Sequence, residues 1–310
     1  MILTCGDALF DVFANPGAAS SSIVLDARVG GSPLNVGVAL SRLGQRTGFL
    51  AKVSTDPFGR RLIAYLQSEG IDTDLVVRTQ APTTLAIVAL DDRGVPTYSF
   101  YTSGTADRSL EQAELPARLP EAIRVVHVGS YTTALEPTAS SLEALVRRER
   151  GLRLVSYDPN IRPSIVPDPD LWRRRVAALT AQSHLVKASM EDIQFLYPGA
   201  AVDGVLSDWL SRGAAVAIAT MGEVGALAMT RHGTAARVSS VAVKVVDTVG
   251  AGDTFQAALL TWLAEHGRLS SEGLASLSAD DLQALLRFAA RAAAITCSRR
   301  GADMPRRAEL

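Results

Sequence analysis

The chain has 310 residues, of which 31 are basic and 32 acidic, and its formal net charge at pH 7 is −1. A nearly neutral chain has no global field that attracts nucleic acid or a membrane surface, so we expect neither as a partner. The hydrophobic fraction of 47% excludes an intrinsically disordered protein. The two cysteines lack the spacing of a metal or redox site, and no stretch is typical of a signal peptide or a transmembrane helix. We therefore expect a cytoplasmic protein.

The first part of the sequence alternates apolar runs with glycine-rich turns. Met1–Cys5, Ala8–Phe13 and Thr47–Val53 are predicted strands. A turn at Gly30–Asn35 precedes a helix. A second helix begins at Asp56, because a cap residue is followed there by proline at the first helical position.

The strands Thr83–Leu90 and Val95–Tyr101 flank the polar turn Asp91–Gly94, which is typical of a β-hairpin. They interrupt the alternation of strands and helices. With residues near Phe13–Val29 they predict a small sheet apart from the core, formed by about residues 13–29 and 83–103. Such a sheet suits a lid, since closing lids exclude water from reactive phosphates. An antiparallel edge of the main sheet fits the same pattern.

From residue 124 onward strands and helices alternate regularly. The predicted strands are Arg124–Val128, Leu152–Tyr157, His184–Lys187, Ala214–Thr220 and Val241–Val246, with a hairpin at Gly225–Val238. The predicted helices are Thr138–Arg150, Asp170–Thr180, Met190–Leu196, Val202–Arg212 and Ala279–Cys297. This alternation predicts an α/β fold with a doubly wound, mostly parallel sheet, and we expect residues 1–310 to form one domain. Ligands of such sheets bind beyond the carboxyl ends of the strands.

The turn Asp247–Phe255 leads from a predicted strand into a helix with one apolar face. Gly250, Ala251 and Gly252 leave backbone N–H groups free at the positive end of the helix dipole, where a phosphate binds well. Asp253 adds a carboxylate among these donors. The combination suits a site where a group loses a proton beside developing negative charge.

Two motifs together resemble the signatures of the PfkB, or ribokinase-like, carbohydrate kinases. Gly30–Asn35, continued to Leu43-Gly44, is similar to the first signature, and Asp247–Phe255 matches the second nearly residue for residue. Either glycine motif alone is weak, but their order and separation make the pair specific. The resemblance covers essentially the whole chain. It is strongest to bacterial fructokinases, through Gly6-Asp7, Ser99–Tyr101, Gly104–Arg108, Asp158–Arg162 and Cys297–Asp303.

This resemblance implies an ATP-dependent sugar kinase that transfers the γ-phosphoryl group to a hydroxyl of a free sugar, with fructose as the first choice. It implies that Asp253 is the catalytic base and that Gly250, Ala251 and Gly252 hold the transferring phosphate. The implied sugar contacts are Asp11, Gly31, Asn35, Phe100 and Arg162. Taken singly, Asp253 and Asn35 can be helix caps, Asp11 and Arg162 surface residues, and Phe100 a core aromatic.

The resemblance also implies a nucleotide site formed by Asn160, Lys187, Thr220, Gly222 and Gly225. The glycines are equally typical of a plain hairpin, and Lys187 of an exposed lysine. Mg²⁺ is expected as MgATP, with Glu191 as its protein contact, although Ala188 replaces the asparagine of the family motif. A monovalent cation such as K⁺ is implied beside Asp247 and Val249.

Several alternatives stay open at this point. A 2-keto-3-deoxygluconate kinase shares the Asp158–Arg162 element, but it tends to carry an arginine after the lid aromatics, where this chain has Thr102. A ribokinase or nucleoside kinase is the next alternative. A non-catalytic sugar or nucleotide sensor is the hypothesis of a different class, although a sensor has no need of Asp253. Open strand edges in the lid also predict a homodimer.

Overall fold

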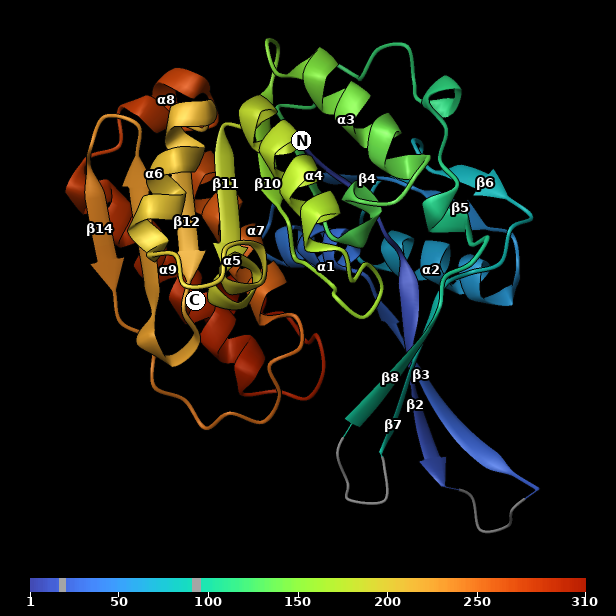
Figure 1. The fold of residues 1–310 in the computed structure, drawn as a ribbon. Coiled ribbons are helices and arrows are strands. Elements are labelled where there is room, and N and C mark those ends of the chain that lie inside the picture. The colour runs from blue at the N-terminus through green and yellow to red at the C-terminus, as the bar shows by residue number, and fades with distance from the viewer. Residues whose placement is uncertain (17–20, 91–95) are drawn as a thin grey trace.

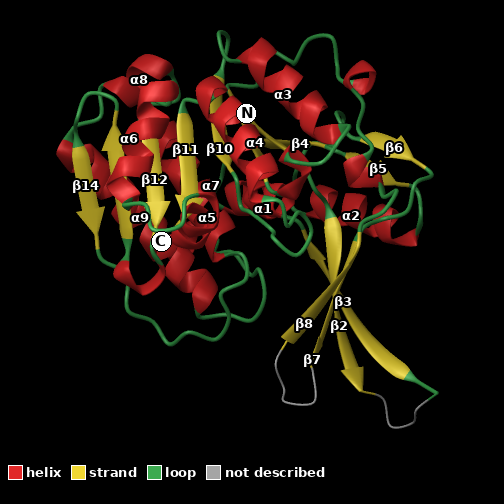
Figure 2. Cartoon of the chain, viewed as in Figure 1, coloured by secondary structure: helices red, strands yellow, loops and turns green. Residues whose placement is uncertain are grey.

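The computed structural model describes residues 1–16, 21–90 and 96–310, and its main element is a large eight-stranded sheet (Figures 1 and 2). Its strand order is β14 (Ala235–Val238), β13 (Ala226–Thr230), β12 (Val216–Thr220), β11 (Leu185–Ser189), β10 (Leu154–Asp158), β9 (Val125–Gly129), β1 (Ile2–Cys5) and β4 (Thr47–Leu50). β13 runs antiparallel to both of its neighbours, and the other seven strands of this sheet run in one direction. The mostly parallel sheet predicted from the sequence is confirmed.

Helices cover both faces of this sheet, so it has two hydrophobic cores (Figure 1). One core contains α1 (Ser32–Arg42), α2 (Pro57–Ser68), α7 (Ala251–Glu265), α8 (Ser271–Ala275) and α9 (Ala279–Cys297). The other contains α3 (Thr138–Glu149), α4 (Pro169–Gln182), α5 (Met190–Leu196) and α6 (Val202–Arg212). A sheet buried on both faces has near-continuous apolar strands, which explains why its strands were recognisable from the sequence.

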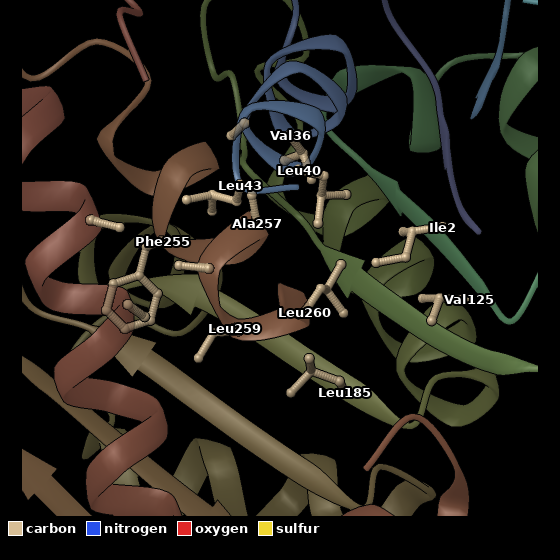
Figure 3. Packing of buried hydrophobic residues seen from close by; sticks show 14 of the residues in the cluster. Ile2, Val36, Leu40, Leu43, Val125, Leu185, Phe255, Ala257, Leu259 and Leu260 are labelled. Atoms are coloured by element: carbon tan, nitrogen blue, oxygen red, sulfur yellow. The ribbon is translucent and has the colours of Figure 1, made fainter. Parts of the chain in front are cut away.

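Helix α7 is buried over most of its length. Figure 3 shows its side chains Ala257 and Leu260 between those of α1, such as Leu40, and those of the strands, such as Val125. Every residue of α7 from Asp253 to Leu263 is buried. The position of its N-terminal turn is therefore fixed by packing on both sides.

A second, four-stranded sheet projects away from the body (Figure 1). We call it the projecting sheet. Its strand order is β3 (Ile23–Gly30), β2 (Leu9–Pro16), β7 (Leu85–Leu90) and β8 (Pro96–Tyr101). The prediction of a separate small sheet is confirmed, and the alternative of an edge of the main sheet is wrong. The predicted strand Ala8–Phe13 belongs to the projecting sheet, and the predicted turn Asp91–Gly94 lies outside the described residues.

Two predicted strands differ from the structure. Thr47–Val53 divides at Ala51: β4 joins the large sheet, and β5 (Lys52–Ser54) pairs with β6 (Val77–Thr79). Val241–Val246 forms no strand, and its four valines are 38–57% exposed. No strand of the described residues pairs with this segment, and β14 remains the edge of the large sheet. The segment is tied down instead by the N–H groups of Val246 and Asp247, which donate to the Cys297 carbonyl.

The predicted helices agree well with the structure, and α5, α6 and α9 have the expected bounds. Asp56 caps α2 as expected, since its carboxylate accepts from the Gly59 N–H at 2.7 Å. The short helix α8 was not predicted. Within the described ranges, no helix combines the length and the apolar character needed to cross a membrane.

Candidate active site

A cavity of about 470 Å³ lies where the carboxyl ends of β1, β9 and β10 meet the N-terminal turns of α1 and α7 and one side of the projecting sheet. It brings together most of the residues singled out from the sequence. These are Asp11, Gly31, Asn35, Phe100, Asn160, Arg162, Val249, Gly250, Gly252 and Asp253. Ala251 sits between two lining residues at the start of α7. The location agrees with the rule for ligand sites in doubly wound sheets.

Asp253 is the carboxylate on which the two glycine motifs converge. It is 6% exposed, in the first turn of α7. Its Oδ1 accepts a hydrogen bond from the Ser32 hydroxyl at 2.7 Å, and its Oδ2 accepts one from Asn35 Nδ2 at 2.9 Å. Ser32 is 221 positions away in the sequence, yet both donors come from the first turn of α1. The carboxylate is thus oriented before any ligand binds.

Two glycines are required by the backbone geometry of these turns. Gly250 caps α7 in the left-handed conformation, with φ of 79°, and Gly31 caps α1 with φ of 110°. A Cβ atom at Gly31 would lie 2.6 Å from the main-chain oxygen of Asp7, so no larger residue fits. In the first turn of α1, the Ser32 N–H donates to Asp7 Oδ2 at 3.1 Å and Pro33 has no N–H, so the anion-binding helix end of this cavity is that of α7.

Asn160 links Arg162 to Asp253. Its Oδ1 accepts from an Arg162 guanidinium nitrogen at 2.6 Å, and its Nδ2 lies 3.4 Å from Asp253 Oδ1. Asn160 has a φ of +40°, which asparagine tolerates better than most residues. The structure therefore places Asn160, expected near the nucleotide, beside the implied catalytic base.

Asp11 reaches the cavity from β2. Burial raises the pKa of its carboxyl to about 6; the Arg162 charge opposes this rise and the Asp253 charge adds to it. Arg162 is the one basic side chain among the described residues that line the cavity, against three aspartates, Asp7, Asp11 and Asp253.

Lys187, expected at the end of a strand, is the middle residue of β11 and does not line the cavity. It is 3% exposed, and its Nζ lies 2.6 Å from Asp158 Oδ2 and 3.3 Å from the Gly252 carbonyl oxygen. The alternative of an exposed lysine is therefore wrong. The ion pair holds the end of β10 against the turn that begins α7.

The other implied nucleotide residues lie on and after β12, two strands from β10, at the carboxyl edge of the large sheet. Thr220 ends β12 beside Ser189 of β11, and the turn that follows contains Gly222 and Gly225 with φ of 53° and 111°. A hollow of about 160 Å³ lies beside this turn, lined by Met221, Val224, Ala226, Arg237, Val238 and Ser239. None of these residues lines the larger cavity.

The implied metal contacts, Glu191 and Asp247, differ in their exposure and hydrogen bonding. Glu191 is exposed in the first turn of α5. Asp247 Oδ1 accepts from the Val249 N–H at 3.1 Å and Oδ2 from the Gly301 N–H at 2.8 Å. In the parts of the chain that the structure describes, no group of three or more His, Cys, Asp or Glu side chains could hold a metal ion. A divalent ion at this edge would need phosphate oxygens and water as further ligands.

Ten of the lining residues were not predicted as site residues, and four of them, Asp7, Ser32, Ser130 and Tyr131, matter for the chemistry of the cavity. Ser32 escaped because only its contact with Asp253 reveals its role, and Ser130 and Tyr131 follow β9 without any recognisable motif. Ser130 has φ of 67° and ψ of −175°, a backbone conformation almost restricted to glycine. Asp7 carried a signal, since it lies two residues after the carboxyl end of β1. Burial and then the nearby Asp107 raise its pKa to about 7.

A model of the pfkB family of carbohydrate kinases matches residues 6–308. The chain belongs to this family. Among curated relatives, the fructokinase of Rhizobium leguminosarum bv. trifolii is 36% identical over 285 residues, which are 92% of this chain and 85% of the relative. Fructokinase-2 of Solanum habrochaites is 34% identical over 280 residues, 88% of this chain and 82% of the relative.

Solved structures of pfkB carbohydrate kinases have the same fold. The fructokinase of Xylella fastidiosa with bound ATP superimposes with a TM-score of 0.91 at 28% identity, over 99% of this chain and 96% of that one. A fructokinase double mutant of Vibrio cholerae O395, bound to fructose, ADP and a potassium ion, gives a TM-score of 0.81 at 27% identity, over 97% and 93% of the two chains. The predicted ribokinase-like fold, the carbohydrate kinase class and the likeness to fructokinases are confirmed.

Proposed function

We propose that this chain transfers the γ-phosphoryl group of ATP to a hydroxyl of fructose. The observation that carries the proposal is the position of Asp253, which is oriented by Ser32 and Asn35 inside the cavity and at the N-terminus of α7. A base and an anion-binding helix end are adjacent there, as phosphoryl transfer to an alcohol requires.

The residues of the cavity would have separate roles in this reaction. The sugar hydroxyl donates its proton to Asp253 as its oxygen attacks phosphorus, and the N–H groups around Gly250, Ala251 and Gly252 stabilise the charge on the transferring group. Because the transition state of phosphoryl transfer is loose, orientation contributes more than base strength. Asp11, Gly31, Asn35, Phe100 and Arg162 would hold the sugar. The projecting sheet would act as a lid through Phe13, Val88 and Phe100, which line the cavity.

The charges of the cavity favour a neutral sugar over a sugar acid. Three lining aspartates face one lining arginine, so a substrate carboxylate would enter a cavity that already has more acidic than basic side chains. Arg108 offers no compensation, since its guanidinium donates to the Thr102 main-chain oxygen at 2.8 Å and to its hydroxyl at 3.2 Å. Neutral hydroxyls can donate to the aspartates and accept from Arg162 and Asn35.

The test is ATP consumption by the purified protein with fructose, 2-keto-3-deoxygluconate, ribose and adenosine. We expect a kcat/KM for fructose at least about tenfold above the others, the difference that one well-placed charge contact makes. Turnover of the keto acid without turnover of fructose would contradict the proposed substrate. Binding without turnover of any of the four would support a sensor.

We infer that Mg²⁺ enters as MgATP, held mainly by the phosphates and water, with Glu191 as the nearest acidic side chain expected to reach it. The nucleotide site for ATP would be formed by Asn160, Lys187, Thr220, Gly222 and Gly225. K⁺ is the expected ion at Asp247 and Val249, since carboxylate and carbonyl oxygens are its usual ligands. Turnover should stop with a chelator and return with Mg²⁺. Replacing K⁺ salts by choline salts should lower kcat, and an unchanged kcat would exclude the cation site.

We also infer a homodimer formed through the projecting sheets. Ile23, Val24 and Leu25 on its edge strand β3 are 61%, 62% and 52% exposed, and an open apolar edge favours pairing with another strand. Sedimentation velocity should give twice the mass of one chain, and a monomer at micromolar concentration would refute the dimer.

A cytoplasmic location fits the use of ATP and the two free cysteines; cell fractionation tests it.

A further inference from the structure

The buried carboxylate of Asp107 connects two parts of the molecule. One is the base of the projecting sheet, and the other is the part of the cavity wall formed by Ser130 and Tyr131, which we call the floor of the cavity. Asp107 is 2% exposed and does not line the cavity. It lies in the short 3-10 turn Ala106–Arg108, which follows β8 in the chain. None of the roles assigned above uses it.

On one side, this carboxylate binds the two ends of the β7–β8 hairpin. Its Oδ1 accepts from the hydroxyl of Thr84, directly before β7, at 2.6 Å and from that of Thr105, after β8, at 2.9 Å. The two hydroxyls lie 2.7 Å apart, and both threonines are at most 3% exposed. One oxygen atom therefore holds the place where the hairpin leaves the body and the place where it returns.

On the other side, the same carboxylate binds the floor of the cavity. Its Oδ2 accepts from the hydroxyl of Tyr131, which follows β9 and lines the cavity. Next to Tyr131, Ser130 is held in a backbone conformation that almost only glycine adopts. Tyr131 itself is 1% exposed, so a shift of its hydroxyl would have to move the surface that the sugar contacts.

We propose that Asp107 is a positioning residue that fixes the β7–β8 hairpin relative to Tyr131, so that the lid and the sugar pocket share one hinge. The hairpin carries Val88 and Phe100 into the cavity. A buried charged acceptor with donors on both sides gives strong, directional bonds. Without this charge the hairpin is no longer held to Tyr131. The hairpin and the floor of the cavity are then not fixed in their binding positions before a sugar binds.

Three variants and one control test this hinge. Asp107→Asn keeps the volume but leaves one oxygen and one amide nitrogen, which cannot accept from both sides at once. Thr84→Val removes only the hydroxyl on the hairpin side, and the double variant combines the two. Thr138→Val is the matched control: this hydroxyl is equally buried and donates to the main-chain oxygen of Asp107 at 3.0 Å, but not to its carboxylate.

The kinetic readout rests on the proposed function. Asp107→Asn should raise the KM for the sugar about tenfold or more and leave the KM for ATP within about twofold. Thr84→Val should raise the sugar KM in the wild-type background but add less than about twofold to Asp107→Asn, because both act through one contact. Thr138→Val should leave both KM values unchanged. Equal rises in both KM values, or a lower melting temperature with no change in either, would overturn the proposal.

Amide hydrogen exchange of the ligand-free protein gives a readout that needs no turnover. Exchange in β7 and β8 should be faster in Asp107→Asn and Thr84→Val than in the wild type and in Thr138→Val. Unchanged protection of the hairpin would overturn the hinge even if fructose is the substrate. Failure of the wild type to phosphorylate any sugar would refute the proposed function and leave this measurement valid. Should Asp107→Asn not fold, Thr84→Val decides the question by both readouts.

Discussion

Replacing Asp253 by alanine is expected to lower kcat by a factor of about 10² or more, the usual contribution of a positioned general base. The KM values for sugar and ATP should change by less than about threefold, since the interaction with the reacting proton develops only in the transition state. The variant should fold, because the hydrogen bonds that it loses come from Ser32, Asn35 and Asn160, which face the cavity and can bind water instead.

The matched control for this variant is Glu265→Gln. Glu265 is also a carboxylate of α7, but it lies at the far end of the helix and pairs with Arg307 on the surface at 2.9 Å. Its kcat should equal that of the wild type. A wild-type kcat in Asp253→Ala would show that the transferring hydroxyl is deprotonated elsewhere and would remove Asp253 from its role.

Replacing Lys187 by methionine should produce the largest loss of stability of any variant considered. The substitution leaves Asp158 without its partner at 1% exposure. Breaking a buried ion pair from one side costs about 3–5 kcal/mol, which corresponds to a decrease in melting temperature of about 5–15 °C in a chain of this size. Lys52→Met is the control, because Lys52 pairs with Glu114 in a more exposed setting and should cost less.

The loss at Lys187 should depend on pH in a defined direction. In the wild type, burial raises the pKa of Asp158 to about 6, and the Lys187 charge opposes that rise. Without Lys187 the folded-state pKa rises further above its unfolded value. The carboxyl can then stay protonated in the folded protein, and the stability falls as the pH rises from about 4 through 6 and beyond.

Differential scanning calorimetry of Lys187→Met at pH 5.5 and pH 8 measures this effect. The difference in melting temperature from the wild type should be larger at pH 8, and adding Asp158→Asn should recover part of it. An equal loss at both pH values, or no recovery in the double variant, would mean that Lys187 acts through packing rather than through its charge.

The sequence predicted the layers of the fold because burial on both faces leaves a plain pattern. Strands β9 to β12 are mostly apolar and buried and alternate with amphipathic helices, so their existence followed directly. Val241–Val246 has an equally apolar pattern and forms no strand. A strand requires a hydrogen-bonding partner, and local sequence does not reveal whether a sheet edge is available.

The site was predictable where chemistry depends on local sequence. The turn around Gly250 and the carboxylate of Asp253 form one continuous motif, and the structure brings Gly31 and Asn35 to it. Ser130, Tyr131 and Asp107 were not predictable, because their roles arise from contacts between segments far apart in the chain. Lys187 shows the same limit: the sequence placed it at a strand end, and only the fold revealed its ion pair with Asp158.

Phosphorus NMR of the protein mixed with ATP, Mg²⁺ and fructose tests the central claim most directly. We expect the γ-phosphate signal of ATP to be replaced by signals of ADP and of a sugar phosphomonoester, with no inorganic phosphate in excess of a protein-free control. The Asp253→Ala protein should give less than about a hundredth of that rate. Release of inorganic phosphate without a phosphomonoester, or an unchanged rate in Asp253→Ala, would contradict the account of this cavity as a site of phosphoryl transfer to fructose.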